Sequence, residues 1–220
     1  MTQSVFDPSF ADLPARLPVF PLTGVLLLPR GRLPLNIFEP RYLAMTRHAL
    51  AHGRMLGMIQ PQEGAGDVGD PPLYRTGCMG RITEFRETDD GRYLITLKGC
   101  ARFDVKAEPP RDTLFRTVVP DWGPYEGDLA ESEPELERER LVAALKPYFR
   151  RTGIEADFKS IAGAPAERLI SSLAMLCPLA PGEKQALLET AGWSERGRLL
   201  IALLEMAARA SIEDAGPARH

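Results

Sequence analysis

The chain has 220 residues, of which 44% are hydrophobic and 26% charged, and its formal net charge is −3 at pH 7. This balance is typical of a globular protein, and it gives no positive field that would attract a nucleic-acid backbone. The longest aliphatic run, Val25–Leu28, is far shorter than the ~20 apolar residues of a membrane span. The first ten residues carry neither a basic cluster nor a long apolar core, so we expect no secretory signal and a cytoplasmic location.

Residues 13–122 have the pattern of a small β-barrel. Short apolar runs alternate with prolines between residues 17 and 37, which is typical of edges and corners because proline cannot donate to a strand ladder. Further strands are expected over residues 55–60 and 115–119. Six or seven strands with short connections predict a closed or nearly closed barrel. The polar stretch 1–12 before it is expected to be a flexible tail.

The strongest strand pattern is a two-residue alternation of apolar and polar side chains between residues 92 and 106. It predicts a long, half-buried strand with a bend at Gly99. The Asp90-Gly91 pair just before it is typical of a hairpin turn. Residues 78–87 are therefore expected to form the antiparallel partner strand.

One helix interrupts the predicted strands. It is expected to begin at Pro40, because proline at the first helical position loses no hydrogen bond, and to end at Gly53. Glu39 is expected to cap its first amide groups. The apolar face of this helix, spaced at 3.6 residues per turn, consists of Tyr42, Met45, Thr46, Ala49 and Leu50.

The second half of the sequence changes from strand-like to helical. Residues 123–135 are acidic and interrupted by glycine and proline, which predicts an exposed linker. Within it, Ser132 and Glu135 have the spacing of a capping box for the helix that follows. Residues 136–212 predict a helical bundle, and residues 213–220 a disordered tail.

The helices of the bundle are separated by proline and glycine breaks. They are expected up to residue 151, over residues 157–162, 165–176 and 181–192, and from residue 194 onward. Leu169, Leu173 and Leu176 are expected to face inward. Gly192 is expected to end one helix and Ser194 to cap the last one.

A glycine pattern of the form G-x-G-x-x-G occupies residues 64–69. In dinucleotide-binding proteins this pattern opens a helix whose first amides hold the pyrophosphate. Here Asp70-Pro71-Pro72 follows, and a helix cannot pass through these residues. We therefore expect a surface loop and no cofactor.

The sequence also shows no pattern typical of a metal site or of a catalytic nucleophile. His48 and His52 lie four residues apart on one helix, but zinc needs three or four ligands and the sequence has only one further histidine, His220. Two solvent-facing histidines and no metal site are the prediction. No nucleophile stands beside a suitable base, so we predict no catalytic residue and no enzyme. The cysteines, odd in number and far apart, predict no disulfide framework: Cys78, Cys100 and Cys177.

The densest cluster of polar and aromatic residues spans residues 38–42. Arg41 and Tyr42 are expected to hold the corner between strand and helix, and this structural role is the favoured interpretation. Phe38, Arg41 and Tyr42 are nevertheless the only candidates that the sequence offers for contact with a substrate or partner.

Several motifs follow one another in an order that resembles the N-terminal domain of Lon protease, over about residues 16–208. They are Leu17-Pro18-Val19-Phe20-Pro21-Leu22, Leu28-Pro29, Leu33-Pro34-Leu35-Asn36-Ile37-Phe38-Glu39-Pro40-Arg41-Tyr42, Cys78-Met79-Gly80-Arg81-Ile82, Tyr93-Leu94-Ile95-Thr96-Leu97-Lys98-Gly99, Ala101-Arg102-Phe103 and Glu183-Lys184-Gln185-Ala186-Leu187-Leu188-Glu189. The resemblance implies an α+β fold, in which a PUA-like β-barrel is followed by a C-terminal helical bundle. It also implies a region used for substrate recognition and assembly.

The ATPase and the Ser-Lys protease centre of Lon lie outside these motifs, so the chain resembles the free-standing bacterial Lon substrate-binding-domain-like proteins. We expect a non-catalytic module that binds flexible or unfolded polypeptide, or docks to a larger protein. RNA or modified-nucleotide binding is the alternative, because PUA-like barrels often serve nucleic acids, although residues 1–122 hold 15 basic against 14 acidic residues. A third possibility is a small-molecule hydrolase or ligase with a pocket of perturbed titratable groups.

Overall fold

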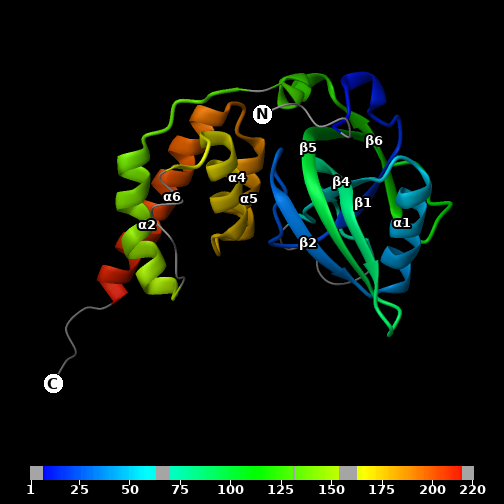
Figure 1. Cartoon of the computed structure of the whole chain (residues 1–220), viewed down its shortest axis with the longest axis horizontal. Helices are drawn as coiled ribbons and strands as arrows, with labels where there is room; N and C mark the ends of the chain where they lie inside the picture. The colour runs from blue at the N-terminus through cyan, green and yellow to red at the C-terminus, as the bar shows by residue number, and fades with distance from the viewer. Residues whose placement is uncertain (1–6, 63–69, 131, 154–162, 215–220) are drawn as a thin grey trace.

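The computed structural model describes residues 7–62, 70–130, 132–153 and 163–214. It has an α+β fold in which a curved, mixed sheet lies beside a group of C-terminal helices (Figure 1). In the described part of the chain, no helix is both long enough and apolar enough to cross a membrane.

Six strands form the sheet: β1 (Leu17–Pro21), β2 (Arg32–Ile37), β3 (Met55–Ile59), β4 (Thr76–Glu87), β5 (Tyr93–Ala107) and β6 (Arg116–Asp121). Their order is β2-β5-β4-β3-β1-β6, and an additional pairing of β5 with β6 nearly closes the sheet into a ring. β1 and β3 are parallel, and the other pairs are antiparallel. The predicted barrel of six or seven strands is confirmed.

The β4–β5 hairpin forms as the alternating pattern predicts. Gly91 in its turn has a φ of 80°, a left-handed conformation that glycine adopts without strain. The register of the two strands shifts between Met79 and Gly80, which pairs with Gly99, so a bulge lies where the bend was expected. A Cβ atom on Gly99 would lie 2.0 Å from the carbonyl oxygen of Leu28, so this close crossing requires glycine.

That crossing involves Val25–Leu28, one of the apolar runs from which the barrel was predicted. This segment has no strand pairing, yet Leu26, Leu27 and Leu28 are at most 3% exposed. Its apolar residues are buried because the segment passes over β5 at Gly99. The apolar run therefore reflects burial and not pairing in the sheet.

The first helix, α1 (Pro40–Ala51), begins at the predicted proline, and Tyr42, Met45, Thr46 and Ala49 on its predicted apolar face are buried. The expected cap was wrong. Glu39 occupies the N-cap position, but its side chain makes no capping hydrogen bond. Arg41 Nε donates to Glu39 Oε2 at 3.0 Å instead, because a guanidinium two residues away competes successfully for the carboxylate.

The C-terminal helices are α2 (Arg138–Thr152), α4 (Ala166–Leu176), α5 (Pro181–Glu189) and α6 (Trp193–Asp214). The expected short helix over residues 157–162 lies outside the described residues. The expected capping box was wrong, because the backbone N–H and Oγ of Ser132 both donate to Glu167 Oε1, at 3.1 and 2.6 Å. Accordingly, α2 begins only at Arg138, and Glu135 has no capping role.

Three details of the later helices also differ from expectation. Leu176 is 77% exposed, because the chain leaves α4 at this point and Cys177, 1% exposed, takes the inward position. α5 ends at Glu189 and not at Gly192, and Ser194 lies inside the first turn of α6 and does not cap it.

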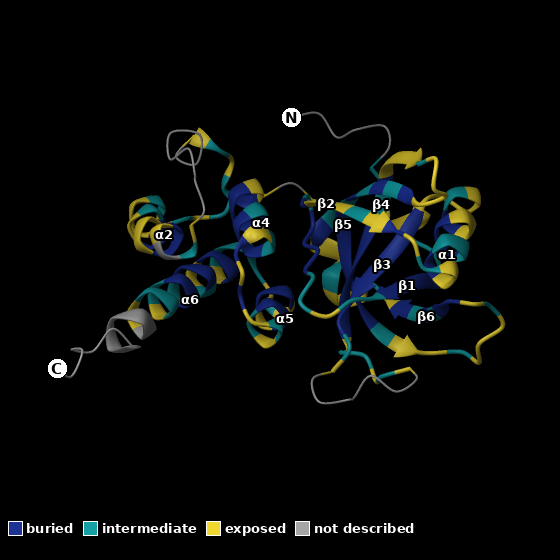
Figure 2. Cartoon of the chain, turned by 90° about the horizontal axis from the view of Figure 1, so that it is seen from below, coloured by how far each residue is buried: buried dark blue, intermediate teal, exposed yellow. Residues whose placement is uncertain are grey.

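The barrel and the helices share one apolar core. A single cluster of buried side chains includes Phe20, Leu28 and Ile37 from the barrel together with Leu173 and Leu187 from the helices. A second, smaller cluster consists of buried residues of the barrel strands and includes Val19, Met79 and Phe103. Figure 2 shows this buried surface as dark blue on the strands and on the helix faces.

A buried ion pair joins the barrel to the helices. Residues 123–129, expected as part of an exposed linker, form a 3₁₀ helix in which Asp128 is 6% exposed. Arg102 of β5 donates to both carboxylate oxygens of Asp128, at 2.8 Å each. The same guanidinium donates to the carbonyl oxygens of Leu188, Thr190 and Ala191, at 2.7–3.1 Å. The end of α5 is therefore bound to the barrel. The two regions that the sequence divides, the barrel and the helices, pack against each other in the structure.

Asp128→Ala should lower the free energy of unfolding by about 3–5 kcal/mol, because it leaves the buried Arg102 charge without its partner. Urea unfolding followed by circular dichroism measures this change. Glu84→Ala is the matched control, since it breaks an exposed ion pair with Arg32 and should leave the unfolding midpoint close to that of the wild type. Equal effects of the two substitutions would contradict the role of Asp128.

Candidate functional site

The corner between β2 and α1 carries the three residues that the sequence singles out. Tyr42 lies on the inner face of α1 and is 8% exposed, with its ring centroid 4.1 Å from that of Phe20. Arg41 lies over the Tyr42 ring, 4.6 Å from its centroid. Burial raises the pKa of Tyr42, so its hydroxyl stays protonated at neutral pH. Tyr42 is therefore part of the packed core at this corner.

Phe38 differs from Tyr42 because its side chain faces solvent, with 60% of the residue exposed. The Arg92 guanidinium lies 5.9 Å from its ring centroid. Nearby on the hairpin, the ring of Phe85 meets that of Tyr93 edge to face at 5.1 Å, and Phe85 is 42% exposed. Arg47 of α1 donates to the Tyr93 hydroxyl at 2.6 Å.

We call this set the aromatic corner: Phe38, Arg47, Phe85, Arg92 and Tyr93. The sequence pointed to Phe38 alone among its members. Phe85 meets Tyr93 because the β4–β5 register places Glu87 opposite Tyr93, and Phe85 lies two residues from Glu87. The predicted turn at Asp90-Gly91 is the sequence signal that could have placed Phe85 near Tyr93, because the turn sets the pairing of the two strands. Exposed rings beside guanidinium groups suit the binding of apolar side chains and peptide carbonyl groups.

The predicted histidine pair faces solvent but is not isolated. The rings of His48 and His52 stack with their centroids 4.2 Å apart, and His48 also lies 5.3 Å from Phe115. Burial lowers the pKa of His48, and the positive charge of His52 lowers it further. Among the described residues, no group of three or more histidine, cysteine, aspartate or glutamate side chains is placed to hold a metal ion.

The three cysteines are buried and free. Burial raises the pKa of Cys100 and of Cys177 to about 11, and it raises the pKa of Cys78 well above its usual value. These thiols therefore stay protonated at neutral pH, which makes them poor nucleophiles. The glycine pattern at residues 64–69 lies outside the described residues.

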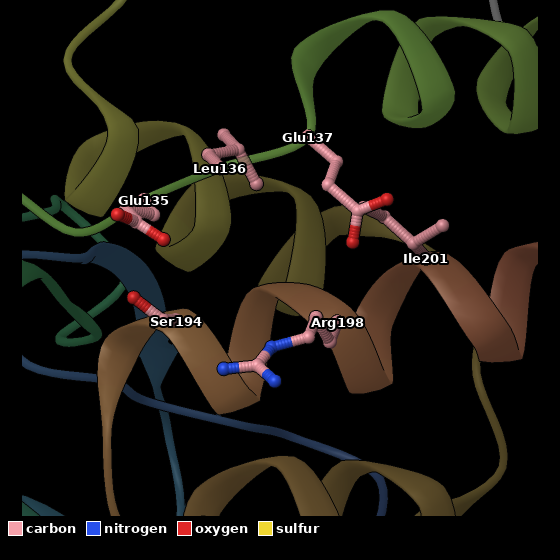
Figure 3. A pocket seen from close by; sticks show the side chains of 6 residues that line it. All are labelled: Glu135, Leu136, Glu137, Ser194, Arg198 and Ile201. Carbon is pink, nitrogen blue, oxygen red and sulfur yellow. The ribbon is translucent and has the colours of Figure 1, made fainter.

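A cavity of about 380 Å³ lies between the segment before α2 and one face of α6. Glu135 and Glu137 line one side, while Ser194, Arg198 and Ile201, spaced as one face of a helix, line the other (Figure 3). Arg198 also pairs with Glu195 at 3.2 Å. No sequence pattern indicates this cavity, because residues 135–137 meet α6 only through the tertiary fold.

The curved sheet with its C-terminal helices is the fold of a Lon N-terminal domain. The crystal structure of the Lon N-terminal domain protein from Xanthomonas campestris matches 85% of this chain and 97% of its own, with a TM-score of 0.60 and 27% identity. The N-terminal domain of Mycobacterium avium complex Lon protease matches with a TM-score of 0.58 and 18% identity, which supports the fold alone.

The chain belongs to the ATP-dependent protease La (LON) substrate-binding domain family, whose model matches residues 16–206. It is 27% identical over 207 residues to Lon protease 2 of Myxococcus xanthus, covering 88% of this chain and 24% of that one. It is 28% identical over 211 residues to Lon protease 2 of Sorangium cellulosum, covering 90% and 26%. The chain thus spans about a quarter of the length of these curated relatives.

Phe38→Ala and Tyr42→Ala should differ in their effect on stability, because Phe38 is on the surface and Tyr42 is in the core. Phe38→Ala should leave the urea unfolding midpoint close to that of the wild type, because most of the side chain is already in water. Tyr42→Ala should lower the free energy of unfolding by about 3 kcal/mol, because it removes a buried ring. A large loss of stability in Phe38→Ala would show that Phe38 belongs to the core and not to the aromatic corner.

His48 should make the folded state less stable as the pH falls from about 7 to 5. Its pKa is lower in the folded state than in the unfolded chain, so the unfolded chain binds the proton more readily. NMR titration should place the His48 midpoint below the usual ~6.5. His52→Gln should raise it only in part, since burial is the larger cause. In urea unfolding, His48→Gln should lose less stability than the wild type between pH 7.5 and 5.5; an equal loss would contradict this assignment.

Proposed function

We propose that this protein binds flexible or unfolded polypeptide without cleaving it, either as a free chain or as an exposed segment of a larger protein. The observation that carries the proposal is the match of residues 16–206 to a substrate-binding domain family. The substrates of the Lon proteases named above give the class of ligand. A cytoplasmic location belongs to the same proposal.

The aromatic corner supports this function. Phe38 and Phe85 are exposed, and apolar side chains are hidden in folded proteins but available in unfolded ones. Arg92 lies beside the Phe38 ring and can donate to peptide carbonyl groups, which every polypeptide carries. Such a surface recognises an unfolded chain through features that do not depend on a particular sequence.

The charges at the corner favour polypeptide over nucleic acid. Arg41 pairs with Glu39 at 2.9 Å, and Arg92 pairs with Asp90 at 2.9 Å. These carboxylates offset the positive potential that a phosphate backbone needs for binding. We therefore do not propose RNA binding, and a labelled RNA serves as a comparison ligand in the binding experiment.

Reduced and carboxymethylated α-lactalbumin, which stays unfolded, should bind the purified protein saturably in fluorescence anisotropy. Native α-lactalbumin should bind at least about tenfold more weakly, because its apolar side chains are buried. A labelled single-stranded RNA should bind weakly and with strong salt dependence. Gel electrophoresis after a long incubation should show intact α-lactalbumin.

Phe38→Ala should weaken binding of the unfolded protein several-fold, since it removes an exposed ring from the corner. Met206→Ala is the matched control, because Met206 is similarly exposed, at 64%, but lies on α6. Equal binding of native and unfolded α-lactalbumin, or cleavage of either that tracks with the purified chain, would refute the proposal.

A further inference from the structure

One edge of the sheet is open along β2. The strand pairs with β5 from Arg32 opposite Lys98 to Ile37 opposite Tyr93. Within the part of the chain that the structure describes, no strand pairs with its other side. An open edge offers backbone N–H and C=O groups that another extended chain can bind.

The register shows which backbone groups face the open side. The Thr96 carbonyl oxygen accepts a hydrogen bond from Thr83 Oγ1 of β4, so the backbone groups of Thr96 point toward β4 and away from β2. Pro34 lies opposite Thr96 and is therefore in a pair that is not hydrogen-bonded. The backbone groups of Arg32, Pro34 and Asn36 thus point to the open side. Proline can occupy this strand because its missing N–H falls there.

The side chains of β2 show what an added strand would meet. Leu33 and Leu35 pack against the core but are only half-buried, whereas Ile37, further along the same face, is 1% exposed. Arg32 and Asn36 alternate with them on the exposed face. An added strand with apolar residues at alternate positions would cover the two leucines.

The edge connects two regions already described. At its start, the loop before β2 is held against α4, since Ser171 Oγ donates to the Pro29 carbonyl at 2.9 Å and Arg30 pairs with Glu167 at 2.7 Å. At its end, Phe38 follows directly and opens the aromatic corner. β2 is also the strand next to the helices in both views (Figure 1) (Figure 2).

We propose that the open edge of β2 binds an extended segment of the polypeptide as an additional strand of the sheet. Arg32 and Asn36 each supply a donor and an acceptor, and Pro34 supplies an acceptor. The bound segment has apolar side chains at alternate positions over Leu33 and Leu35, and it continues toward Phe38. The inference rests on the proposed function, because it names how polypeptide would be held.

A second copy of this chain is a less suitable occupant. Antiparallel pairing of β2 with β2 of another copy, centred on the strand, would set Pro34 opposite Pro34. Each Pro34 carbonyl oxygen would then lie opposite the ring nitrogen of the other Pro34, which has no hydrogen to donate. A different polypeptide with an N–H opposite Pro34 avoids this conflict.

The test removes and adds single backbone donors on the open edge. Asn36→Pro deletes the outward N–H, and Asn36→Ala is the matched control that keeps it. The probe is a fluorescent nine-residue peptide in which valine alternates with threonine, with a lysine at each end. Asn36→Pro should bind it about two- to tenfold more weakly than Asn36→Ala, as expected for one net hydrogen bond. Pro34→Ala restores a donor and should bind about two- to tenfold more tightly than the wild type.

Amide hydrogen exchange by NMR on the wild type gives a measurement that needs no variant. The peptide should slow exchange at Arg32 and Asn36, while Leu33 and Leu35, already paired with β5, should change little. If carboxymethylated α-lactalbumin binds but these amides stay unprotected and the two Asn36 variants bind alike, the edge inference is wrong and the proposed function stands. If no polypeptide binds the wild type, both fail. Dimerisation of Pro34→Ala in sedimentation velocity, without tighter peptide binding, would also overturn the inference.

Discussion

The barrel and the helices are joined by a buried side chain, Arg102 of β5, in addition to the apolar core that they share. Its guanidinium donates both to Asp128 in the 3₁₀ helix and to carbonyl oxygens in the turn after α5. A buried guanidinium is costly unless its donors are paired, and the 3₁₀ helix and the turn supply the acceptors for Arg102. Arg196 of α6 adds bonds to the carbonyls of Leu187 and Thr190, at 2.8 and 2.7 Å. Four separate segments thus meet at the end of α5.

Other contacts between barrel and helices determine the surroundings of β2. The segment Leu26–Leu28 crosses the sheet at Gly99 and leads into the loop that α4 holds. The strand that follows therefore has a defined direction relative to the helices, from α4 toward Phe38. The backbone of β2 is already paired with β5, so it loses little conformational freedom when a flexible chain binds, and most of the ordering cost falls on the ligand.

Local patterns predicted the elements that are set by neighbouring residues. The alternating pattern predicted β5 and the 3.6-residue spacing predicted α1. Both predictions are correct because each element buries the apolar face that its own sequence provides. The errors at Glu39 and Ser132 have another cause: each was assigned to a nearby helix end, but a charged partner competed for the side chain. For Ser132 that partner, Glu167, is 35 residues away in sequence and no local rule could supply it.

The candidate site was predictable to a similar extent. Phe38 was singled out because it belongs to the cluster of polar and aromatic residues at positions 38–42. The structure places it on the surface. Phe85 and Arg92 depend on the pairing of β4 with β5, and the open edge of β2 depends on the order of all six strands. Asp128 was assigned to an acidic linker by composition, whereas its burial follows from Arg102, 26 residues earlier. The composition of a segment predicts the average exposure of its residues, and a single residue such as Asp128 can be buried when it forms an ion pair.

The wide sequence separation of the junction has a consequence for synthesis of the protein. Arg102 leaves the ribosome together with β5, but Thr190 follows only 88 residues later. At about 5–20 residues per second, roughly 4–18 s pass between the two. During that interval the nascent barrel carries Arg102 without its helical partners and the apolar surface that the helices later cover. The barrel is therefore exposed to association with other nascent chains until the C-terminal helices have been translated.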